Sequence, residues 1–129
     1  MYTLGKSERL YKTKIIERLF AGGASSFAIY PLRVVYMTVD EAEAPVSILI
    51  SVSKRRFKHA VDRNSIKRRI REAYRKNKQW LQPLPPEQGG VVVAFVYTGK
   101  DIADSRVVEK RMQAALQRIA RNLQQPAAS

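Results

Sequence analysis

Residues 54–78, KRRFKHAVDRNSIKRRIREAYRKNK, form a strongly basic segment that lies between two apolar stretches of the chain. The segment holds twelve Lys or Arg residues and only two acids, Asp62 and Glu72, which gives it +10 of the chain's net charge of +13. Each positioned cation can neutralise a phosphate and release a condensed counterion, so this concentration of charge indicates a polyanionic partner. A solvated helix face is the alternative, but solubility favours mixed signs and a one-signed run repels itself.

A helical wheel of 100° per residue divides this segment into distinct sides. One arc is apolar and can pack on a sheet; it holds Ile66, Ile70, Ala73 and Tyr74. A second side spans about 100° and is polar; it holds Asn64, Lys67, Arg68, Arg71, Arg75 and Lys78. Arg69 and Lys76 fall away from that side, next to Glu72. Two roles stay open for Asn64, which can cap the helix start with Asp62 or hydrogen-bond to a sugar or base edge.

The rest of the chain predicts two more helices and four strands. The first helix follows a possible cap at Ser7, has apolar residues at helical spacing and stops at Gly22-Gly23. The last helix begins at Asp104 or Ser105 and runs to about Leu123. Runs rich in β-branched and aromatic residues predict strands at residues 24–29, 32–39, 46–53 and 91–97.

The order of these elements predicts an α+β fold. The acids of residues 40–43, followed by Pro45, predict a hairpin loop that pairs strands 32–39 and 46–53 in an antiparallel meander. The strand at 91–97 is nearly all apolar, as a strand covered on both faces would be. Because the basic helix links two strands, it forms a crossover. We therefore expect a two-layer sandwich in which helices cover one face of a sheet.

Length and composition limit the class of protein. A chain of 129 residues fits one domain, residues 1–129, with an ordered core of about 7–123 and a frayed tail at 124–129. The absence of cysteine excludes disulfides and Cys-ligated zinc, and the single histidine, His59, excludes His-rich metal sites. No stretch approaches 18 apolar residues, and the first residues lack the apolar core of a secretory signal. These absences favour an intracellular binding protein.

The acidic side chains do not suggest a nuclease active site. Asp40, Glu41 and Glu43 are interpreted as a solvated loop, and no carboxylates combine with Lys or His in a nuclease pattern. We therefore assign no catalytic residue and no metal ligand to the protein. A helix embedded beside a sheet, without zinc ligands, favours RNA over DNA, because DNA-reading helices normally belong to all-helical or zinc-dependent modules.

A spaced set of residues in the basic segment resembles the signature of the bacterial ribonuclease P protein subunit. The set comprises Ser53-Lys54-Arg55-Arg56, Ala60-Val61-Asp62-Arg63-Asn64, Lys67-Arg68 and Arg71-Glu72. The resemblance covers roughly residues 7–122 and includes Phe20-Ala21-Gly22-Gly23. It implies an α-β-β-β-α-β-α domain similar to the second domain of ribosomal protein S5. In that domain the basic helix lies in a left-handed βαβ crossover, against the usual right-handed rule.

The resemblance also implies a function. Proteins of this family assist a catalytic RNA that removes the 5′ leader of precursor tRNA, with Mg²⁺ held mainly by the RNA and no cofactor held by the protein. The implied partners are the catalytic RNA and precursor tRNA, without membrane or DNA, in the bacterial cytoplasm. The protein would be a subunit of the enzyme, and the RNA would be the catalyst.

Site residues follow from the same resemblance. The catalytic RNA would be contacted by Lys54, Arg55, Arg56, Lys58, Arg63, Asn64, Lys67, Arg68, Arg71, Arg75 and Lys78. The leader would lie in a cleft between the first helix and the sheet, lined by Phe20, Tyr36 and Ile16. Two positions depart from the family pattern: Ile16 stands where a second Phe is frequent, and Lys58 stands where many members have Gly.

Two other functions stay open at this point. One is a structural ribosomal or double-stranded-RNA-binding protein with the same sandwich, and the other is a protein-only nuclease. Cleavage of precursor tRNA by the catalytic RNA at low magnesium, with and without the protein, distinguishes the first from the family function. Cleavage by the protein without RNA would support the second.

Overall fold

The computed structural model describes residues 13–22, 24–39, 46–81 and 90–124. Its elements are α1 (Thr13–Phe20), β1 (Ser25–Ile29), β2 (Leu32–Val39), β3 (Val46–Val52), α2 (Ala60–Asn77), the 3₁₀ turn η2 (Lys78–Trp80), β4 (Gly90–Tyr97) and α3 (Ser105–Gln124). The predicted order of helices and strands is confirmed. The predicted cap at Ser7, the loop at 40–45 and the tail beyond Gln124 lie outside the described residues.

The four strands form one sheet in the order β1-β2-β4-β3. β1 pairs with β2 and β2 pairs with β4, both antiparallel, whereas β3 pairs with β4 in parallel. The predicted hairpin between residues 32–39 and 46–53 is therefore wrong, because β4 lies between these strands. β4 takes the central place because its side chains are apolar on both faces, and all but Val96 are buried.

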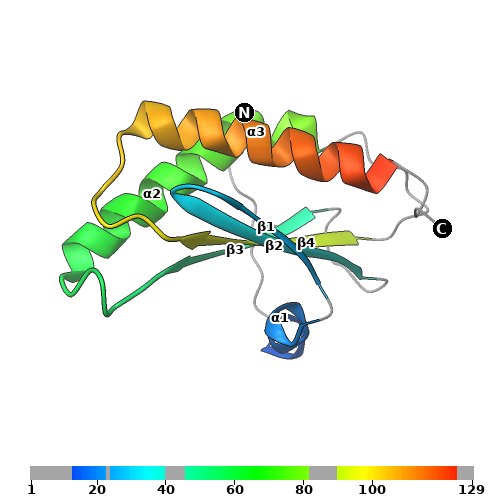
Figure 1. Cartoon of the computed structure of the whole chain (residues 1–129), viewed down its shortest axis with the longest axis horizontal. Helices are drawn as coiled ribbons and strands as arrows, with labels where there is room; N and C mark the ends of the chain where they lie inside the picture. Colours follow the sequence, from blue (N-terminus) through cyan, green and yellow to red (C-terminus); the bar gives the residue numbers. More distant parts are fainter. Residues whose placement is uncertain (1–12, 23, 40–45, 82–89, 125–129) are drawn as a thin grey trace.

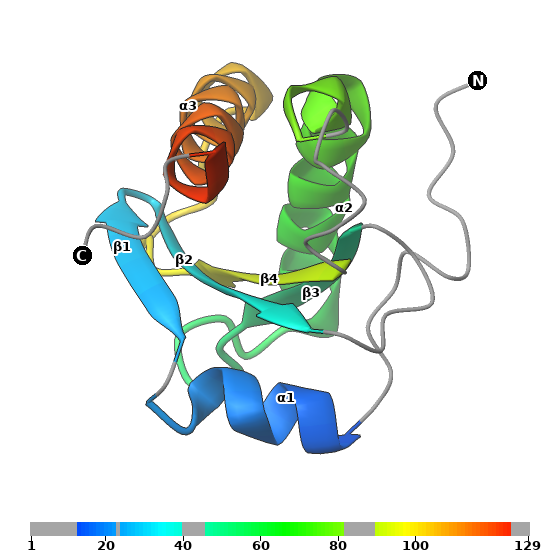
Figure 2. The ribbon, with the colours of Figure 1, turned by 90° about the vertical axis from the view of Figure 1, so that its right-hand side faces the viewer.

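Helices lie on both faces of the sheet. Figures 1 and 2 show α2 and α3 side by side over one face and α1 across the other. The expectation that helices cover one face holds for α2 and α3 but is wrong for α1. The larger core, between the sheet and α2 and α3, contains Phe95, Ile70 and Met112, and a smaller cluster joins Leu19 of α1 to Val35, Val39, Val92 and Ala94. Alternation along β4 supplies residues to both cores.

The basic helix forms the predicted crossover. α2 leaves β3 and leads, through η2, to the parallel neighbour β4. Its apolar side packs on the sheet, where the Tyr74 ring lies 6.2 Å from the Phe95 ring. The left hand of this crossover stays a prediction implied by the resemblance.

Loop 98–104, between β4 and α3, is fixed by the Tyr97 ring. The Tyr97 hydroxyl donates to the Asp101 carbonyl and accepts from the Ala103 backbone N–H at 2.9 Å. Gly99 lies so close to the ring that a Cβ there would come within 2.8 Å of the Tyr97 hydroxyl oxygen. The Asp104 carboxylate then accepts from the Arg106 backbone N–H at 2.9 Å, which confirms Asp104 as the cap of α3.

The Tyr97 hydroxyl generates a prediction about pH. Burial raises the pKa of this hydroxyl above its ordinary value of 10.0. At alkaline pH the folded state therefore keeps a proton that the unfolded state has lost. The contribution of this hydroxyl to the unfolding free energy is complete below the unfolded-state pKa and is lost as pH rises through the folded-state pKa. Tyr97→Phe is expected to lose about 1 kcal/mol of unfolding free energy at neutral pH, because the Ala103 N–H loses its acceptor.

Urea unfolding of both proteins from neutral pH to above pH 10 measures this effect. The gap in unfolding free energy between the wild type and Tyr97→Phe is expected to shrink at alkaline pH. A gap that stays constant through the alkaline range would contradict the role given to this hydroxyl.

Candidate nucleic-acid interface

The inner side of α2 is the predicted apolar arc. Ile66, Ile70, Ala73 and Tyr74 are each at most 3% exposed. Asn77 continues this side at the end of the helix, and its buried carboxamide nitrogen donates to the Ala73 carbonyl at 2.8 Å. The helix is therefore held in a fixed rotation about its axis, which determines where its other side chains point.

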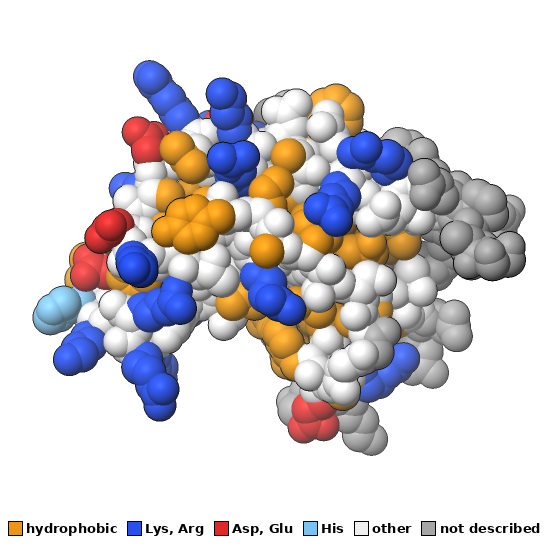
Figure 3. All heavy atoms as spheres, viewed as in Figure 1, with side chains coloured by type: hydrophobic (Ala, Val, Ile, Leu, Met, Phe, Trp, Pro, Cys, Tyr) orange, Lys and Arg blue, Asp and Glu red, His pale blue; other side chains and the backbone are white. Residues whose placement is uncertain are grey.

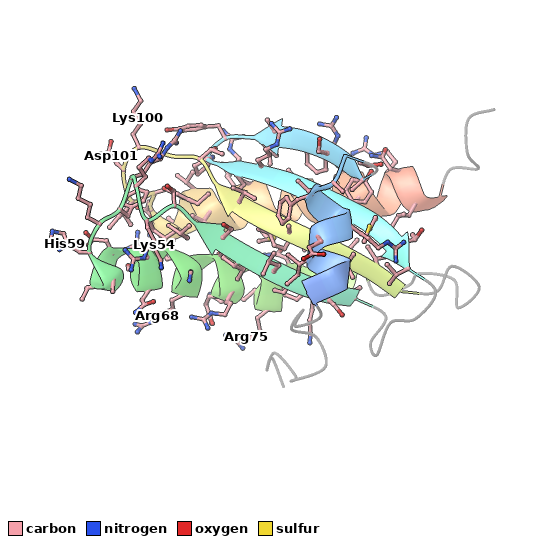
Figure 4. The ribbon with its side chains drawn as sticks, turned by 90° about the horizontal axis from the view of Figure 1, so that it is seen from below. Lys54, His59, Arg68, Arg75, Lys100 and Asp101 are labelled. Carbon is pink, nitrogen blue, oxygen red and sulfur yellow. The ribbon has the colours of Figure 1, made fainter. Side chains whose placement is uncertain are left out.

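The outer side of α2 carries the predicted polar residues. Asn64, Arg68 and Arg71 are exposed, and Lys67 is half-buried. Figure 4 shows Arg68 and Arg75 projecting from α2 away from the sheet. Within the described part of the chain, Lys67, Arg68 and Arg71 have no hydrogen-bonding or ion-pair partner. Their charges are therefore available to a partner molecule.

Three other arginines of the basic segment bind the protein's own backbone. The Arg63 guanidinium donates to the Phe57 carbonyl at 2.7 Å and to the Lys58 carbonyl at 3.0 Å. Arg56 donates to the Thr98 carbonyl, and Arg69 donates to the Ala103 carbonyl. Arg56 and Arg63, both predicted to contact RNA, therefore also hold the loops at this end of the molecule.

Arg75 forms an ion pair with Glu72, one turn earlier on the same helix. The hydrogen bond from Arg75 lowers the pKa of the Glu72 carboxyl below its ordinary value, although the group is exposed to solvent. Part of the Arg75 charge is thus neutralised within the protein. Lys78, the last predicted contact residue, is half-buried in η2 and has interactions of its own.

The alternative role of Asn64 as a helix cap is wrong. α2 begins at Ala60, so the cap position belongs to His59, whose side chain makes no capping hydrogen bond. Asn64 lies in the second turn and is exposed beside Lys67 and Arg68. The amide is therefore free to donate to and accept from a partner.

The loop before α2 presents more cations. The Ser53 hydroxyl accepts from the Arg55 backbone N–H at 3.1 Å, and the buried Phe57 ring packs 5.8 Å from the Tyr97 ring. Lys54 and Arg55, between these anchors, and Lys58, directly after Phe57, are exposed. Figure 4 shows Lys54 at the same end of the molecule as His59 and Lys100. The loop thus continues the cationic side of α2 around the end of the sheet.

A cleft lies between α1 and the opposite face of the sheet. Its volume is about 350 Å³, and it is lined by Leu19, Phe20, Gly22, Ala24, Ser26, Arg33, Val35 and Val96. Phe20 is 50% exposed there, so its ring is accessible. In Figure 3 the surface is hollowed between α1 and the end that carries the single pale-blue histidine. Ile16 is half-buried on α1 but is not among the lining residues of this cleft.

The assignment of Tyr36 to this cleft is wrong. Tyr36 is 6% exposed and belongs to the core under α2 and α3, where its ring packs on Phe27 and its hydroxyl accepts from Asn122 at 2.9 Å. Neighbouring residues on a strand face opposite sides of the sheet. The cleft side of β2 is therefore formed by Arg33 and Val35. Strict alternation from the apolar Val34 could have identified Arg33 from the sequence.

Acidic groups do not converge within the described residues. Across 13–22, 24–39, 46–81 and 90–124, His, Cys, Asp and Glu do not form a group of three or more that could hold a metal ion. The acids at positions 40, 41 and 43 lie outside these ranges. In the same ranges, no helix is both long enough and apolar enough to cross a bilayer.

Sequence comparisons give the family. The ribonuclease P family model matches residues 4–120. The ribonuclease P protein component of Porphyromonas gingivalis is 45% identical over 124 residues, which cover 95% of this chain and 90% of that protein. The corresponding protein of Chlorobium phaeobacteroides is 39% identical over 107 residues, covering 75% and 73%.

Solved structures show the same fold. The ribonuclease P protein of Staphylococcus aureus aligns with a TM-score of 0.70 at 22% identity, covering 92% of this chain and 99% of that chain. The Thermotoga maritima protein gives 0.68 at 22% identity, covering 86% and 96%. With the cationic side of α2, these matches define the class as RNA-binding protein components of tRNA-processing ribonucleoproteins. The chain belongs to the ribonuclease P protein family.

The difference between arginines of α2 that bind backbone carbonyls and arginines that are exposed generates a prediction. Arg63→Ala is expected to lower the unfolding free energy by about 1–2 kcal/mol, because two backbone carbonyls lose a charged donor. Arg71→Ala, matched in chemistry but exposed and without a partner in the described chain, is expected to change it by less than about 0.5 kcal/mol. Urea unfolding monitored by circular dichroism measures both values. Equal losses in the two variants would contradict the division between them.

Proposed function

We propose that this protein binds the catalytic RNA of ribonuclease P through the outer side of α2 and the loop before it. The single observation that carries this proposal is the separation of α2 into a buried apolar side and an outer side on which Lys67, Arg68 and Arg71 have no partner in the described part of the chain. Arg68 and Arg71 present planar donors that match the geometry of phosphate oxygens. Asn64 beside them can recognise a sugar or a base edge. Lys54, Arg55 and Lys58 extend the contact to the adjoining loop.

The cleft beneath the sheet is proposed to hold the single-stranded 5′ leader of precursor tRNA. The half-exposed Phe20 ring offers a stacking surface, and aromatic stacking on unpaired bases does not depend strongly on sequence. Arg33, on the cleft side of β2, places a guanidinium where it can neutralise a leader phosphate. The apolar lining of Leu19, Val35 and Val96 suits sugar and base faces.

This protein contributes positioning, and the RNA contributes the chemistry. Carboxylates and a general base do not come together in the basic segment or in the cleft. We therefore assign hydrolysis to the catalytic RNA and its bound Mg²⁺. By holding both the RNA and the leader, the protein would convert two separate encounters into one oriented complex. Its cations would also lower the repulsion between the two RNAs, which lowers the magnesium concentration that assembly requires. The bacterial cytoplasm is the proposed location.

The outer side of α2 gives the first test. Arg68→Ala and Arg71→Ala are each expected to weaken binding of the catalytic RNA by roughly 1–3 kcal/mol, because each removes a charge-assisted contact. Lys76→Ala is the matched control, since Lys76 is exposed on the same helix but lies off this side. Filter binding at fixed salt measures the three affinities. A loss in Lys76→Ala as large as in Arg68→Ala would show that total charge, not the outer side, determines binding.

The cleft gives a second test. Phe20→Ala is expected to weaken binding of precursor tRNA to the holoenzyme by about 1–3 kcal/mol, the usual loss for one stacked base. Mature tRNA, which has no leader, is the control ligand, and its affinity is expected to stay the same. If Phe20→Ala weakens both ligands equally, the ring does not act on the leader.

A further inference from the structure

α3 carries a second set of cations that the basic segment does not include. Arg106, Lys110, Arg111, Arg118 and Arg121 are all exposed. On a helical wheel they occupy the side opposite the buried Met112 and Ile119. The only acid of the helix, Glu109, is half-buried and lines the groove between α3 and α2. The outward side of α3 is therefore cationic without a compensating acid.

The positive charge of the chain is concentrated in the basic segment and in α3. Residues 54–78 carry +10, and residues 105–124 carry five cations and one acid, or +4. Since the whole chain carries +13, all remaining residues together carry 13 − 14, or −1. The cations of α3 are thus not part of a uniformly basic surface. A face that served only solubility would combine positive and negative charges, as the remaining residues of the chain do.

The cations of α3 sit on a rigid support. Val108, Met112, Leu116 and Ile119 are at most 1% exposed and fix the helix on the sheet. At a rise of about 1.5 Å per residue, the stretch from Arg106 to Arg121 is about 22 Å long, which spans several consecutive phosphates. Arg118 lies over the Phe27 ring, 4.4 Å from its centre, so its guanidinium is also held in place. Figure 3 shows Lys and Arg side chains along the upper part of the molecule, where Figure 1 places α3.

The chemistry of this surface favours a folded RNA. None of the exposed large apolar side chains on α3 is aromatic, so the surface offers no platform for stacking unpaired bases. Double-helical RNA is instead recognised by shape and by its backbone phosphates. An anionic membrane fits less well, because Val107 is the only large apolar side chain on the outward side and interfacial helices need a wide apolar face.

We propose that the outward side of α3 is a second RNA-binding surface, which docks on the phosphate backbone of a double-helical segment. It lies on a different helix from the proposed contact of the catalytic RNA and on the opposite face of the sheet from the leader cleft. The protein therefore joins two RNA segments rather than covering one. This inference rests on the proposed function for the nature of the partner, RNA, but not for the residues involved.

The test uses three variants and two labelled probes, an RNA duplex of roughly 16 base pairs and poly-glutamate as an acidic polypeptide. The α3 variant carries Arg106→Gln, Lys110→Gln and Arg111→Gln, and the α2 variant carries Arg68→Gln and Arg71→Gln. The charge-retaining control carries Arg106→Lys and Arg111→Lys. Fluorescence anisotropy gives the affinity at several KCl concentrations between about 50 and 200 mM. Circular dichroism confirms folding, and Lys110→Gln alone replaces the triple variant if that variant does not fold.

The α3 variant is expected to bind about tenfold or more weakly, and the magnitude of its log–log salt slope is expected to fall by about 2.7, or about 0.9 for each of three lost phosphate contacts on a duplex. The charge-retaining control is expected to bind as the wild type does. Unchanged affinity and slope in the α3 variant would overturn this inference, even if the α2 variant is impaired. Impairment of the α3 variant alone would support it and would show that duplex binding is separate from the proposed contact of α2 with the catalytic RNA. Loss of poly-glutamate binding with unchanged duplex binding would assign the surface to an acidic polypeptide and overturn the proposal.

Discussion

The packing of α2 against the sheet determines where every cation of this helix lies. Ile66 and Ile70 are buried almost completely, and burial of such side chains contributes about 1.5–3 kcal/mol each. A half-turn of the helix about its axis would expose both and press Arg68 and Arg71 onto an apolar sheet. Burying unpaired charges costs several kcal/mol per group, so this alternative is strongly disfavoured. The apolar side thus orients the cationic side, and the position of the cationic surface is a consequence of the core.

Much of the fold follows from local sequence patterns. The bounds of β2 and the inner residues of α2 agree with prediction, because period-2 and period-3.6 patterns report directly on burial. Strand order does not follow from such patterns. β2 and β3 are neighbours in sequence, yet β4 inserts between them, since a strand apolar on both faces is best covered at the centre of a sheet. The placement of α1 on the opposite face depends on the second apolar surface of β2 and β4, which a helix wheel does not show.

The sequence predicts the cations of the basic segment as a set, but it does not predict their separate roles. Composition and wheel position identify a cationic side, whereas the carbonyls that Arg56 and Arg63 contact come from loops whose path the sequence does not determine. The resemblance gives Tyr36 a role but not the register of β2, and a shift of one residue moves a side chain to the other face. The same register places Arg33 on the cleft side. The cations of α3 are dispersed along the sequence and gather only on the folded helix.

Cleavage of precursor tRNA by the catalytic RNA at low magnesium, with and without this protein, tests the central claim most directly. The account predicts little cleavage by the RNA alone, efficient cleavage when the wild-type protein is added, and a marked loss of this gain when Arg68 and Arg71 are both replaced by Ala. The same rate with and without the protein would contradict the account. So would cleavage by the protein in the absence of the catalytic RNA.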